Sequence, residues 1–303
     1  MKLLKVIMLV SALFGLLQSP ARAVMVEDLY TVELPVADQT TGLRLESFSE
    51  AFKQVIVKVS GSDDALRSPA FERPIENSAR YVKQFRYLNR EPEAGKKEVY
   101  DVSRLILRID FDQQLIEGLL REQNFPVWGR ERPSTLLVIS YDVNENIRLV
   151  SDDATPDLVD ELDRAASMLA VPVLFPLMDL EDIAMVNIGD IASRQYENIN
   201  TMAKRYQPNA LLVGRIVGRS GAGWQGDWEA QFAEQVFNWT FKAPSRQAVI
   251  DQLVRNLAKV LAQEYAPEDH LLVEQSLLLS VSDLEGIDKL IKVRQYLTSL
   301  NVV

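Results

Sequence analysis

The stretch LLVGRIVGRSGAGWQGDWEAQF, Leu211 to Phe232, constrains most strongly how this chain can fold. Its five glycines, from Gly214 to Gly226, raise the question of a phosphate-binding loop. A Walker loop needs G-x-x-x-x-G-K-[ST] before a helix, and a dinucleotide loop needs G-x-G-x-x-G between a strand and a helix. Here apolar and polar residues alternate on both sides of the glycines, which predicts two strands joined by a turn.

The glycines then have structural roles in this predicted hairpin. Gly221 and Gly223 are expected to supply the positive φ angles of the turn. Gly214 and Gly218 lie within or at the end of the first strand, where a glycine marks a bulge or a close backbone approach. The run GRSGA at 218–222 is one residue away from the G-x-S-x-G of serine hydrolases, but that motif requires a strand, a turn and a helix.

The other polar candidates have simple structural interpretations. His270 is the single histidine and lies in APEDH, a predicted linker, so we interpret it as a surface residue rather than a catalytic base. Asp110 and Asp112 flank Phe111, and we favour strand-end and capping roles for them over an acid–base pair. An acidic cluster lacks the spacing and central glycine of a calcium loop, so helix capping explains it better. Its members are Asp152, Asp153, Asp157, Asp160, Glu161 and Asp163.

Three tryptophans, Trp224, Trp228 and Trp239, leave two alternatives open. They could form a platform on which a sugar stacks, because aromatic faces bind carbohydrate. Alternatively they pack in the core of a half-buried meander, since Trp228 alternates with charged residues along its strand. The core interpretation is favoured.

The first 23 residues, MKLLKVIMLVSALFGLLQSPARA, have the pattern of a secretory signal peptide. Lys2 and Lys5 begin it, and Ala21 and Ala23 place small residues at positions −3 and −1 of a cleavage site. The apolar run between them is shorter than the roughly 20 residues of a membrane span, so an uncleaved anchor is the weaker alternative. We expect cleavage after Ala23 and a soluble protein in the periplasm of a Gram-negative cell.

Composition narrows the classes of function. The chain contains no cysteine, which excludes disulfides, thiol catalysis, cysteine-based zinc sites and lipid attachment at a cysteine. Its formal net charge is −10, and such a surface repels nucleic acid and anionic lipid headgroups. No segment after the leader is apolar enough to span a bilayer. We therefore expect no nucleic-acid partner, no transmembrane segment in the mature chain, no cofactor and no metal site.

The chain after the leader predicts an α+β / α/β protein. Residues 24–133 predict an N-terminal α+β domain with a long hairpin, whose strands KQFRYLNR and VYDVSRLILRIDFD are separated by EPEAGKKE. Residues 134–266 alternate strands and helices and end in a meander, which favours a mixed-sheet α/β domain. Residues 267–303 predict a strand–helix unit that stops at NVV with its return strand barely begun.

Local signals predict several helix boundaries. A helix over TTGLRLESFSEAFKQVIVKVS is expected to end at Gly61, and a second helix from Ser68 to Tyr81 is expected to be interrupted near Pro74. Pro156 stands at the first position of another helix. The predicted helix caps are Asp112, Thr155 and Ser245.

Several blocks carry a family resemblance: VELPVADQTTGLRLESFSEAFKQVIVKVSG, VKQFRY, PVWGRERP and NALLVGRIVG. From about Val32 to the C-terminus, the chain resembles a family of Gram-negative envelope proteins, domain of unknown function family 2066. Proteins of that family are secreted and have no assigned activity, so the resemblance implies no catalytic residues. Members often continue beyond the point where this chain stops. The element order of residues 134–266 is also similar to periplasmic modules of curli-secretion, flagellar-assembly and penicillin-binding-protein-activator lipoproteins, which favours a protein-binding role.

The block PVWGRERP, Pro126 to Pro133, holds the candidate contact residues Trp128, Arg130 and Arg132. Tryptophan and arginine are enriched at interface hot spots. In one interpretation Trp128 fills the seam between the two domains and the arginines pair with nearby acids. In the other, this elbow is exposed and contacts an envelope partner.

Together these observations predict a non-enzymatic periplasmic protein of unknown role that binds another cell-envelope component. A carboxylate-dependent hydrolase, or a binder of glycans or small ligands, is the alternative. A buried pair of carboxylates in a deep cleft would favour the enzyme, and a flat surface with exposed aromatic residues would favour the partner binder.

Overall fold

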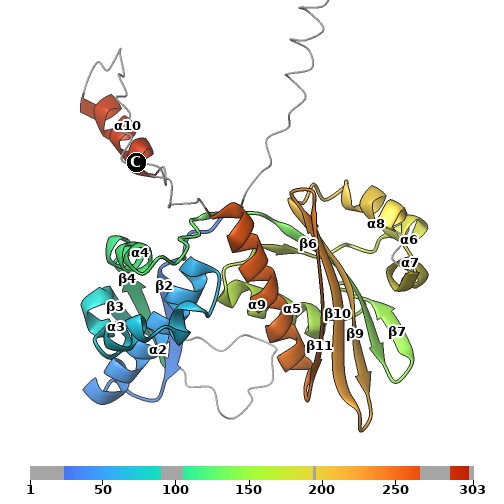
Figure 1. The fold of residues 1–303 in the computed structure, drawn as a ribbon, viewed down its shortest axis with the longest axis horizontal. Helices are drawn as coiled ribbons and strands as arrows, with labels where there is room; N and C mark the ends of the chain where they lie inside the picture. Colours follow the sequence, from blue (N-terminus) through green and yellow to red (C-terminus); the bar gives the residue numbers. More distant parts are fainter. Residues whose placement is uncertain (1–23, 90–104, 194–195, 267–286, 300–303) are drawn as a thin grey trace, which may run out of the picture. The chain divides into compact units, whose positions relative to one another are not determined.

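The computed structural model describes residues 24–89, 105–193, 196–266 and 287–299 (Figure 1). The predicted signal peptide with its cleavage site at Ala23, His270 and the strand predicted after it all lie outside these residues. Helices and strands are combined in an α+β fold, as the sequence predicted. Among the helices within these ranges, none is long and apolar enough to cross a membrane.

Contacts divide the chain into two compact units. We call Tyr30–Gly129 the N-terminal unit, and we call Arg130–Tyr265 with the preceding residues up to Leu29 the sheet unit. After Tyr265 the described element is the helix α10 (Ile287–Ser299).

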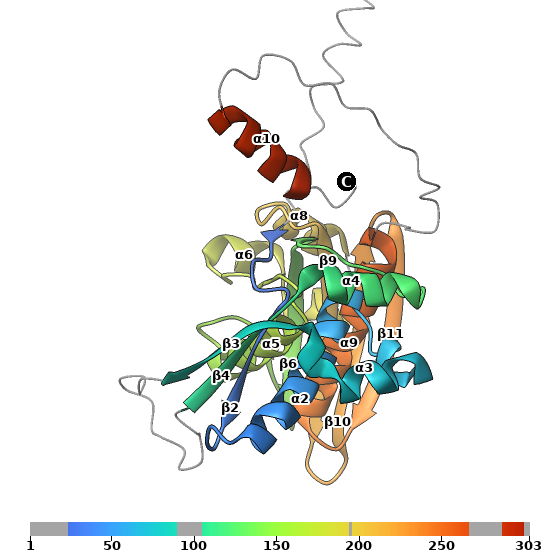
Figure 2. The same cartoon turned by 90° about the vertical axis from the view of Figure 1, so that its left-hand side faces the viewer.

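The N-terminal unit is an antiparallel three-stranded sheet of order β2-β4-β3 with helices, and Figure 2 shows these strands from a second side. The predicted hairpin is confirmed, because β3 pairs antiparallel with β4. Asp112 caps α4 as predicted, and its carboxylate accepts from the Leu115 N–H at 3.1 Å. The helices and strands are β2 (Thr31–Val36), α2 (Thr41–Ser60), α3 (Glu72–Glu76), β3 (Val82–Asn89), β4 (Leu105–Phe111) and α4 (Gln113–Glu122).

The core of this unit forms where α2 packs on the sheet. Apolar residues of α2 recur at helical spacing and are buried, so one stripe of the helix faces β2 and β4. Phe52 contacts the rings of Tyr81 and Phe111 at centroid distances of 4.8 and 6.1 Å. The helix ends where predicted, since Gly61 has a φ of 71° and its N–H donates to the Val57 carbonyl at 2.8 Å.

The single helix predicted from Ser68 to Tyr81 was wrong. The structure has a 3-10 turn at Pro69–Phe71, the short helix α3, and a second 3-10 turn at Ser78–Tyr81. Pro74 does not interrupt α3, because it lies in its first turn, where an amide N–H is not needed. The break comes instead at Asn77, which leaves the helical conformation with φ −106° and ψ 29°.

The sheet unit is built on a mixed sheet of order β11-β10-β9-β6-β7, with β8 also paired to β6. The strands β6, β8 and β9 are parallel to one another, and the remaining neighbours are antiparallel. The elements are β1 (Val24–Met25), β5 (Glu131–Arg132), β6 (Thr135–Val143), β7 (Asn146–Leu149), α5 (Pro156–Met168), β8 (Val173–Leu174), α6 (Leu180–Met185), α7 (Ile188–Ser193), α8 (Tyr196–Ala203), β9 (Ala210–Arg219), β10 (Gly223–Phe232), β11 (Gln235–Ala243) and α9 (Arg246–Tyr265).

Helices cover the two faces of this sheet unequally. The helices α5 and α9 lie on one face, and α6, α7 and α8 lie on the other, as Figure 1 shows. The second group packs over β9, β6 and β7, through a core cluster that includes Val138, Val213 and Ile199. The residues of β11 that point to this face, such as Asn238 and Thr240, are exposed, whereas those that point to α9 are half-buried. Within the described residues, no helix therefore covers β11 on this face.

The glycine stretch folds as the predicted hairpin between β9 and β10, with φ angles of 77° at Gly221 and 79° at Gly223. The glycines inside the strands make room for tryptophan. A Cβ on Gly214 would lie 2.4 Å from the Trp228 ring, and a Cβ on Gly218 would lie 2.7 Å from the Trp224 ring. The indoles therefore lie flat against the backbone, which is the close approach that these glycines predicted.

The compact units do not follow the predicted boundary at residue 133. Residues 24–29 and 130–133 belong to the sheet unit. The physical reason is a two-stranded ladder, since β1 pairs with β5 through Val24 with Arg132 and Met25 with Glu131. Most of the strand–helix unit predicted for residues 267–303 lies outside the described residues, and its described part is a helix over Ile287–Ser299, within the predicted helical segment.

Candidate functional site

The first candidate is the half of the sheet that α6–α8 leave uncovered, which we call the polar face. Along β10, Trp228, Ala230 and Phe232 are buried on the side of α9, where Phe232 contacts the Tyr265 ring. The residues between them point to the opposite side. Strand register aligns Asp227 with Thr240 of β11 and Arg215 of β9, and it aligns Glu229 and Gln225 with Asn238 and Lys242 of β11. The polar face consists of Arg215, Gln225, Asp227, Glu229, Gln231, Asn238, Thr240 and Lys242.

Asp227 is the centre of this face. Its carboxylate accepts hydrogen bonds from Arg215 Nε at 2.7 Å, Gln225 Nε2 at 3.0 Å and Thr240 Oγ1 at 2.9 Å. Burial acts to raise the pKa of Asp227, but these hydrogen bonds outweigh it, and the pKa lies below its ordinary value. The group is therefore an ionised acceptor at neutral pH, which does not suit the role of a general acid.

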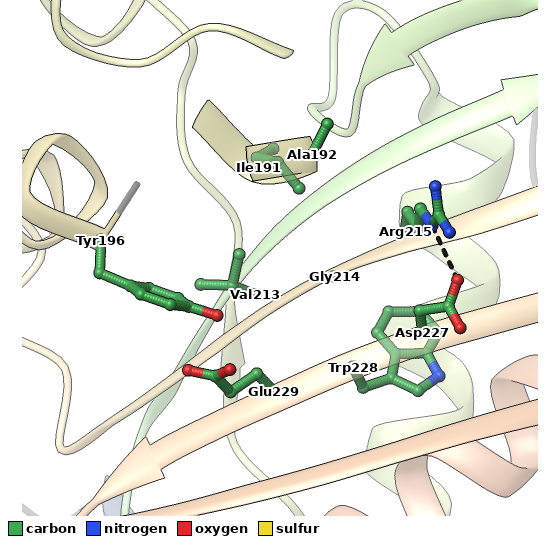
Figure 3. Close-up of a pocket in the computed structure, with 9 residues that line it drawn as sticks. All are labelled: Ile191, Ala192, Tyr196, Val213, Gly214, Arg215, Asp227, Trp228 and Glu229. Atoms are coloured by element: carbon green, nitrogen blue, oxygen red, sulfur yellow. Dashed lines mark hydrogen bonds and ion pairs between the residues drawn. The ribbon is translucent and has the colours of Figure 1, made fainter. Parts of the chain in front are cut away.

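A pocket of about 280 Å³ lies where the polar face meets α7 and α8. Figure 3 shows Arg215 with Asp227 at one end of this pocket, and Tyr196 with Glu229 at the other. The Glu229 side chain is buried and accepts from Gln231 Nε2 at 2.9 Å. The pocket therefore offers carboxylates, a guanidinium and a phenol to a ligand that forms several hydrogen bonds.

A larger and more open hollow of about 820 Å³ continues along α8 toward the turn between β10 and β11. Asn200 and Lys204 line it from the side of α8, and Gln231 and Val236 line it from the strands. Polar side chains line both hollows. Among the residues that the structure describes, no group of three or more metal-ligating side chains could hold an ion.

The second candidate is an apolar surface on and beside α6, which we call the α6 patch. It consists of Leu177, Leu180 and Ile183, whose exposed fractions are 63%, 88% and 58%. Leu180 and Ile183 are three residues apart on the helix and so share one face. Exposed leucines scattered singly are ordinary, whereas three within seven residues form a patch of the kind that marks an interface.

A charge network centred on the buried Asp182 holds α6 in place beneath this patch. Asp179 caps the helix and accepts from the N–H groups of Glu181 and Asp182 at 3.1 and 3.0 Å. Arg205 donates to both carboxylates, with a distance of 2.9 Å from Nη2 to Asp179 Oδ2. Hydrogen bonds from Arg205 hold the pKa of Asp179 well below its usual range. The short helix is thereby anchored at its N-terminus.

Tyr206 closes the same network. The Asp182 side chain is fully buried and accepts from the Met178 N–H at 3.0 Å and from the Tyr206 hydroxyl. That hydroxyl also accepts from the Leu177 N–H at 2.8 Å. Burial, together with the hydrogen bond to Asp182, raises the pKa of Tyr206 to about 12. The apolar side chains above are therefore presented on a backbone that is fixed by several hydrogen bonds, so little ordering remains for a partner to induce.

The predicted contact residues in PVWGRERP have internal partners. Trp128 is fully buried, and its backbone N–H donates to the Val59 carbonyl at 2.7 Å. Arg132 is also fully buried and donates to the carbonyls of Leu169 and Ala170, both at 3.0 Å, at the C-terminus of α5. Arg130 is partly buried and donates to the Glu27 carbonyl at 3.3 Å. None of the three is among the exposed groups of the two candidate surfaces.

The remaining sequence candidates are structural in the described chain. Asp110 accepts from Thr31 and Gln84 at 2.9 and 2.7 Å on the N-terminal sheet. Within the acidic cluster, Glu161 pairs with Arg246. Ser220 lies in a strand–turn–strand and donates to Asn144 Oδ1 at 3.2 Å, so the nucleophile elbow of a hydrolase is absent there.

The three tryptophans do not form one exposed platform. Trp228 is buried, and Trp239 is half-buried opposite it in the register of β10 and β11. Trp224 stacks on Tyr141 with a centroid distance of 6.1 Å and an interplanar angle of 10°. The core interpretation describes them better than the sugar-stacking interpretation.

Comparison with known proteins identifies one family match. Residues 23–129 match the family described as Domain of unknown function (DUF8605). The resemblance to family 2066 was therefore wrong, because the family that matches is a different one. No curated protein and no solved structure matches the chain. The match ends before the sheet unit begins to form its sheet, so it carries no information about either candidate surface.

Sequence reasoning missed both surfaces for different reasons. The polar face was visible as alternation, since Asp227, Glu229 and Gln231 follow one another at every second position. What could not be seen is which face the helices leave open. The α6 patch follows a capping signal, in which Asp179 precedes two acidic residues, but six residues are too few to show helical periodicity.

Proposed function

We propose that this chain is a periplasmic protein without a catalytic role, and that it binds another protein of the cell envelope through the α6 patch. The observation that carries the proposal is the exposure of Leu177, Leu180 and Ile183 above a charge network centred on the buried Asp182. A rigid apolar surface lowers the ordering cost of association, and its desolvation supplies the driving force. The basic start of the chain, its apolar run and the Ala21–Ala23 site support export.

The test is a photo-crosslinking amino acid introduced at Leu180 in intact cells. We expect a specific crosslink to another envelope protein, identified by mass spectrometry. The matched control is the same crosslinker at Arg255, which is exposed on α9 on the opposite face of the sheet. Equal crosslinking from both positions, or none from Leu180, would contradict the proposal.

A double variant separates binding from folding. Leu180→Lys with Ile183→Lys should abolish partner capture, because it places charge where apolar surface must be buried. Both side chains are exposed, so the free energy of unfolding should change by no more than about 0.5 kcal/mol. Unchanged capture by this folded variant would remove the α6 patch from consideration. Recovery of the protein from the periplasmic fraction, with an N-terminus at Val24, tests the proposed location.

A specific observation also supports the second candidate, a binder of glycans or small polar ligands. The polar face provides an ordered row of hydrogen-bonding groups beside the pocket of about 280 Å³. Titration with chitotriose, an N-acetylated amino-sugar oligomer, followed by NMR, tests this candidate. Shifts at the polar face that disappear in Glu229→Gln would support it, and the α6 variant serves as the control.

A further inference from the structure

The strand β11 lies beside β10 and forms an outer edge of the mixed sheet (Figure 1). It pairs with β10 in nine consecutive residue pairs, from Trp224 with Ala243 to Phe232 with Gln235, without a register shift. No strand of the described residues pairs with its other edge. A regular edge of this length presents backbone N–H and C=O groups to any strand that can lie beside it.

The other sheet edges in the described chain are protected in the ways that natural edge strands use. In the N-terminal unit, β2 contains Pro35, and β3 has a register shift between Val82 and Gln84 with the basic residues Lys83 and Arg86. In the sheet unit, β7 has four residues. By contrast, β11 has no proline and no shift, and one charged residue, Lys242, near its end. The length and regularity of β11 therefore favour pairing with another strand.

The sequence of β11 indicates what that partner is. Its central residues, FNWTF at 237–241, form a pattern that is symmetric about Trp239. A polar residue, Asn238 or Thr240, flanks Trp239 on each side, and a phenylalanine follows on each side. The aromatic residues are half-buried on one face, and Asn238 and Thr240 are exposed on the other. A two-fold interface requires such self-complementarity, because each residue meets the symmetry-related position of the same surface.

An antiparallel pair of two β11 strands centred on Trp239 satisfies these requirements. Phe237 of one copy then lies opposite Phe241 of the other, and Asn238 lies opposite Thr240. Aromatic cross-strand pairs of this kind stabilise sheets. Lys242 lies opposite Val236, so the basic residues of the two copies do not face each other. An extended strand from an unrelated protein would gain nothing from this symmetry.

We propose that β11 pairs antiparallel with β11 of a second copy of this chain, with the two-fold axis at Trp239. Two strands of nine residues at roughly 3.4 Å per residue align over about 30 Å and exchange about ten backbone hydrogen bonds. The two mixed sheets then form one continuous sheet. This proposal goes beyond the proposed function and does not use the α6 patch, so either can fail without the other.

The absence of cysteine from the sequence permits a test of register. Two differently tagged variants of the full chain, Asn238→Cys and Thr240→Cys, are purified after export, mixed and mildly oxidised. Residues directly opposite each other lie at a Cα distance that a disulfide can bridge, whereas diagonal neighbours lie about 7 Å or more apart. We expect the mixed disulfide to exceed either homodisulfide. Homodisulfides in equal or greater amount would overturn the proposed pairing.

Sedimentation and light scattering of the unmodified protein provide the second readout. We expect a dimer that dissociates on dilution. The double variant Asn238→Lys/Thr240→Lys places two pairs of like charges directly opposite each other and should weaken the dimer about tenfold or more. Both positions are exposed, so the variant should remain folded by circular dichroism, although loss of the Thr240 hydrogen bond to Asp227 should lower its melting temperature slightly.

Three outcomes would overturn the proposal. The first is a protein that remains monomeric at high concentration. The second is a dimer that the folded lysine variant leaves unchanged. The third is a photo-crosslinker at Asn238 that captures a different protein in cells and never a second copy, because this result would assign the edge to a foreign strand.

Discussion

The two sheets of this protein are built alike on their faces. Each buries one face under a helix of 20 residues, α2 in the N-terminal unit and α9 in the sheet unit. On the other face of each lies an aspartate that accepts from a threonine and a glutamine, Asp110 in one sheet and Asp227 in the other. The recurrence indicates that such a cluster belongs to the construction of the sheet. Asp227 alone is therefore not a sign of catalysis.

The sheets differ at their edges and in their additional helices. The edges of the N-terminal sheet contain Pro35 and a register shift, and the sheet unit ends in the regular strand β11. Only the sheet unit carries α6, whose outer face is apolar and whose inner face holds the buried Asp182. Features shared by both sheets explain stability, and features of one sheet are the candidates for binding.

Truncating the buried Trp228 should destabilise the protein more than any other change proposed below. The strands of the N-terminal sheet contain no glycine, whereas Trp228 lies flat between Gly214 and Gly226. Trp228→Ala should lower the free energy of unfolding of the sheet unit by about 3–5 kcal/mol, because it removes a fully buried aromatic side chain. Urea denaturation followed by circular dichroism measures this change.

Gly214→Ala tests the same contact between Gly214 and the Trp228 ring by changing the glycine instead of the tryptophan. Its Cβ would lie 2.4 Å from both the Asp227 carbonyl oxygen and the Trp228 ring, so the cost should again be several kcal/mol. Gly118→Ala in α4 is the control, since a Cβ there meets nothing within 4 Å. If Gly214→Ala is tolerated as well as Gly118→Ala, the close packing described here is incorrect.

Much of this architecture could be predicted because long elements carry periodicity. The spacing of apolar residues in α2, the alternation through β9 and β10, and the capping serine of α9 all gave correct predictions. In α9 the Ser245 hydroxyl accepts from the Ala248 N–H at 3.2 Å, as its position suggested. Thr155 precedes α5 as predicted, but its side chain does not cap the helix and bonds to Ser151 instead.

The missed elements are short or use turns without glycine. The strand β7 follows Asn144 and Glu145, which have φ angles of 48° and 71°. Neither is the glycine by which such a turn is normally recognised. The helices α6 and α7 have six residues each, less than two turns. The α6 patch is exposed only because of how α6 lies over its charge network, which depends on Arg205 and Tyr206, more than 20 residues further along the chain.

A smaller effect should test whether Asp110 and Asp227 are equivalent. Asp227→Ala and Asp110→Ala should each cost about 1–3 kcal/mol, since the substitution leaves donors without their acceptor. Burial acts to raise the pKa of each aspartate. Hydrogen bonds from Gln84 and Thr31 to Asp110, and from Arg215 to Asp227, outweigh burial and lower both pKa values. These groups therefore stabilise the fold above the unfolded pKa of about 4, and that stability is lost as the pH falls through the lower folded pKa.

The measurement is the denaturation midpoint between pH 7 and pH 2 for each variant. Both variants should lose less stability in acid than the parent, because each lacks one carboxylate whose protonation is unfavourable in the folded state. Asp153→Ala, at an exposed position, is the control. If Asp227→Ala folds as stably as the parent but loses ligand binding, the equivalence of the two aspartates fails and the polar face becomes the functional site.

The smallest effect compares two glycines that end elements in the two units. Gly61 ends α2 with φ 71°, and Gly221 lies in the β9–β10 turn with φ 77°. A Cβ on Gly221 would meet nothing within 4 Å, so substitution there tests the backbone conformation alone. Gly221→Ala and Gly61→Ala should each cost about 1 kcal/mol, because an alanine resists positive φ. Gly221→Asn should cost less, since asparagine tolerates this region. In thermal unfolding, the parent should be the most stable, followed by Gly221→Asn and then by the two alanine variants. A Gly221→Asn variant less stable than Gly221→Ala would mean that contacts, rather than the backbone angle, determine the turn.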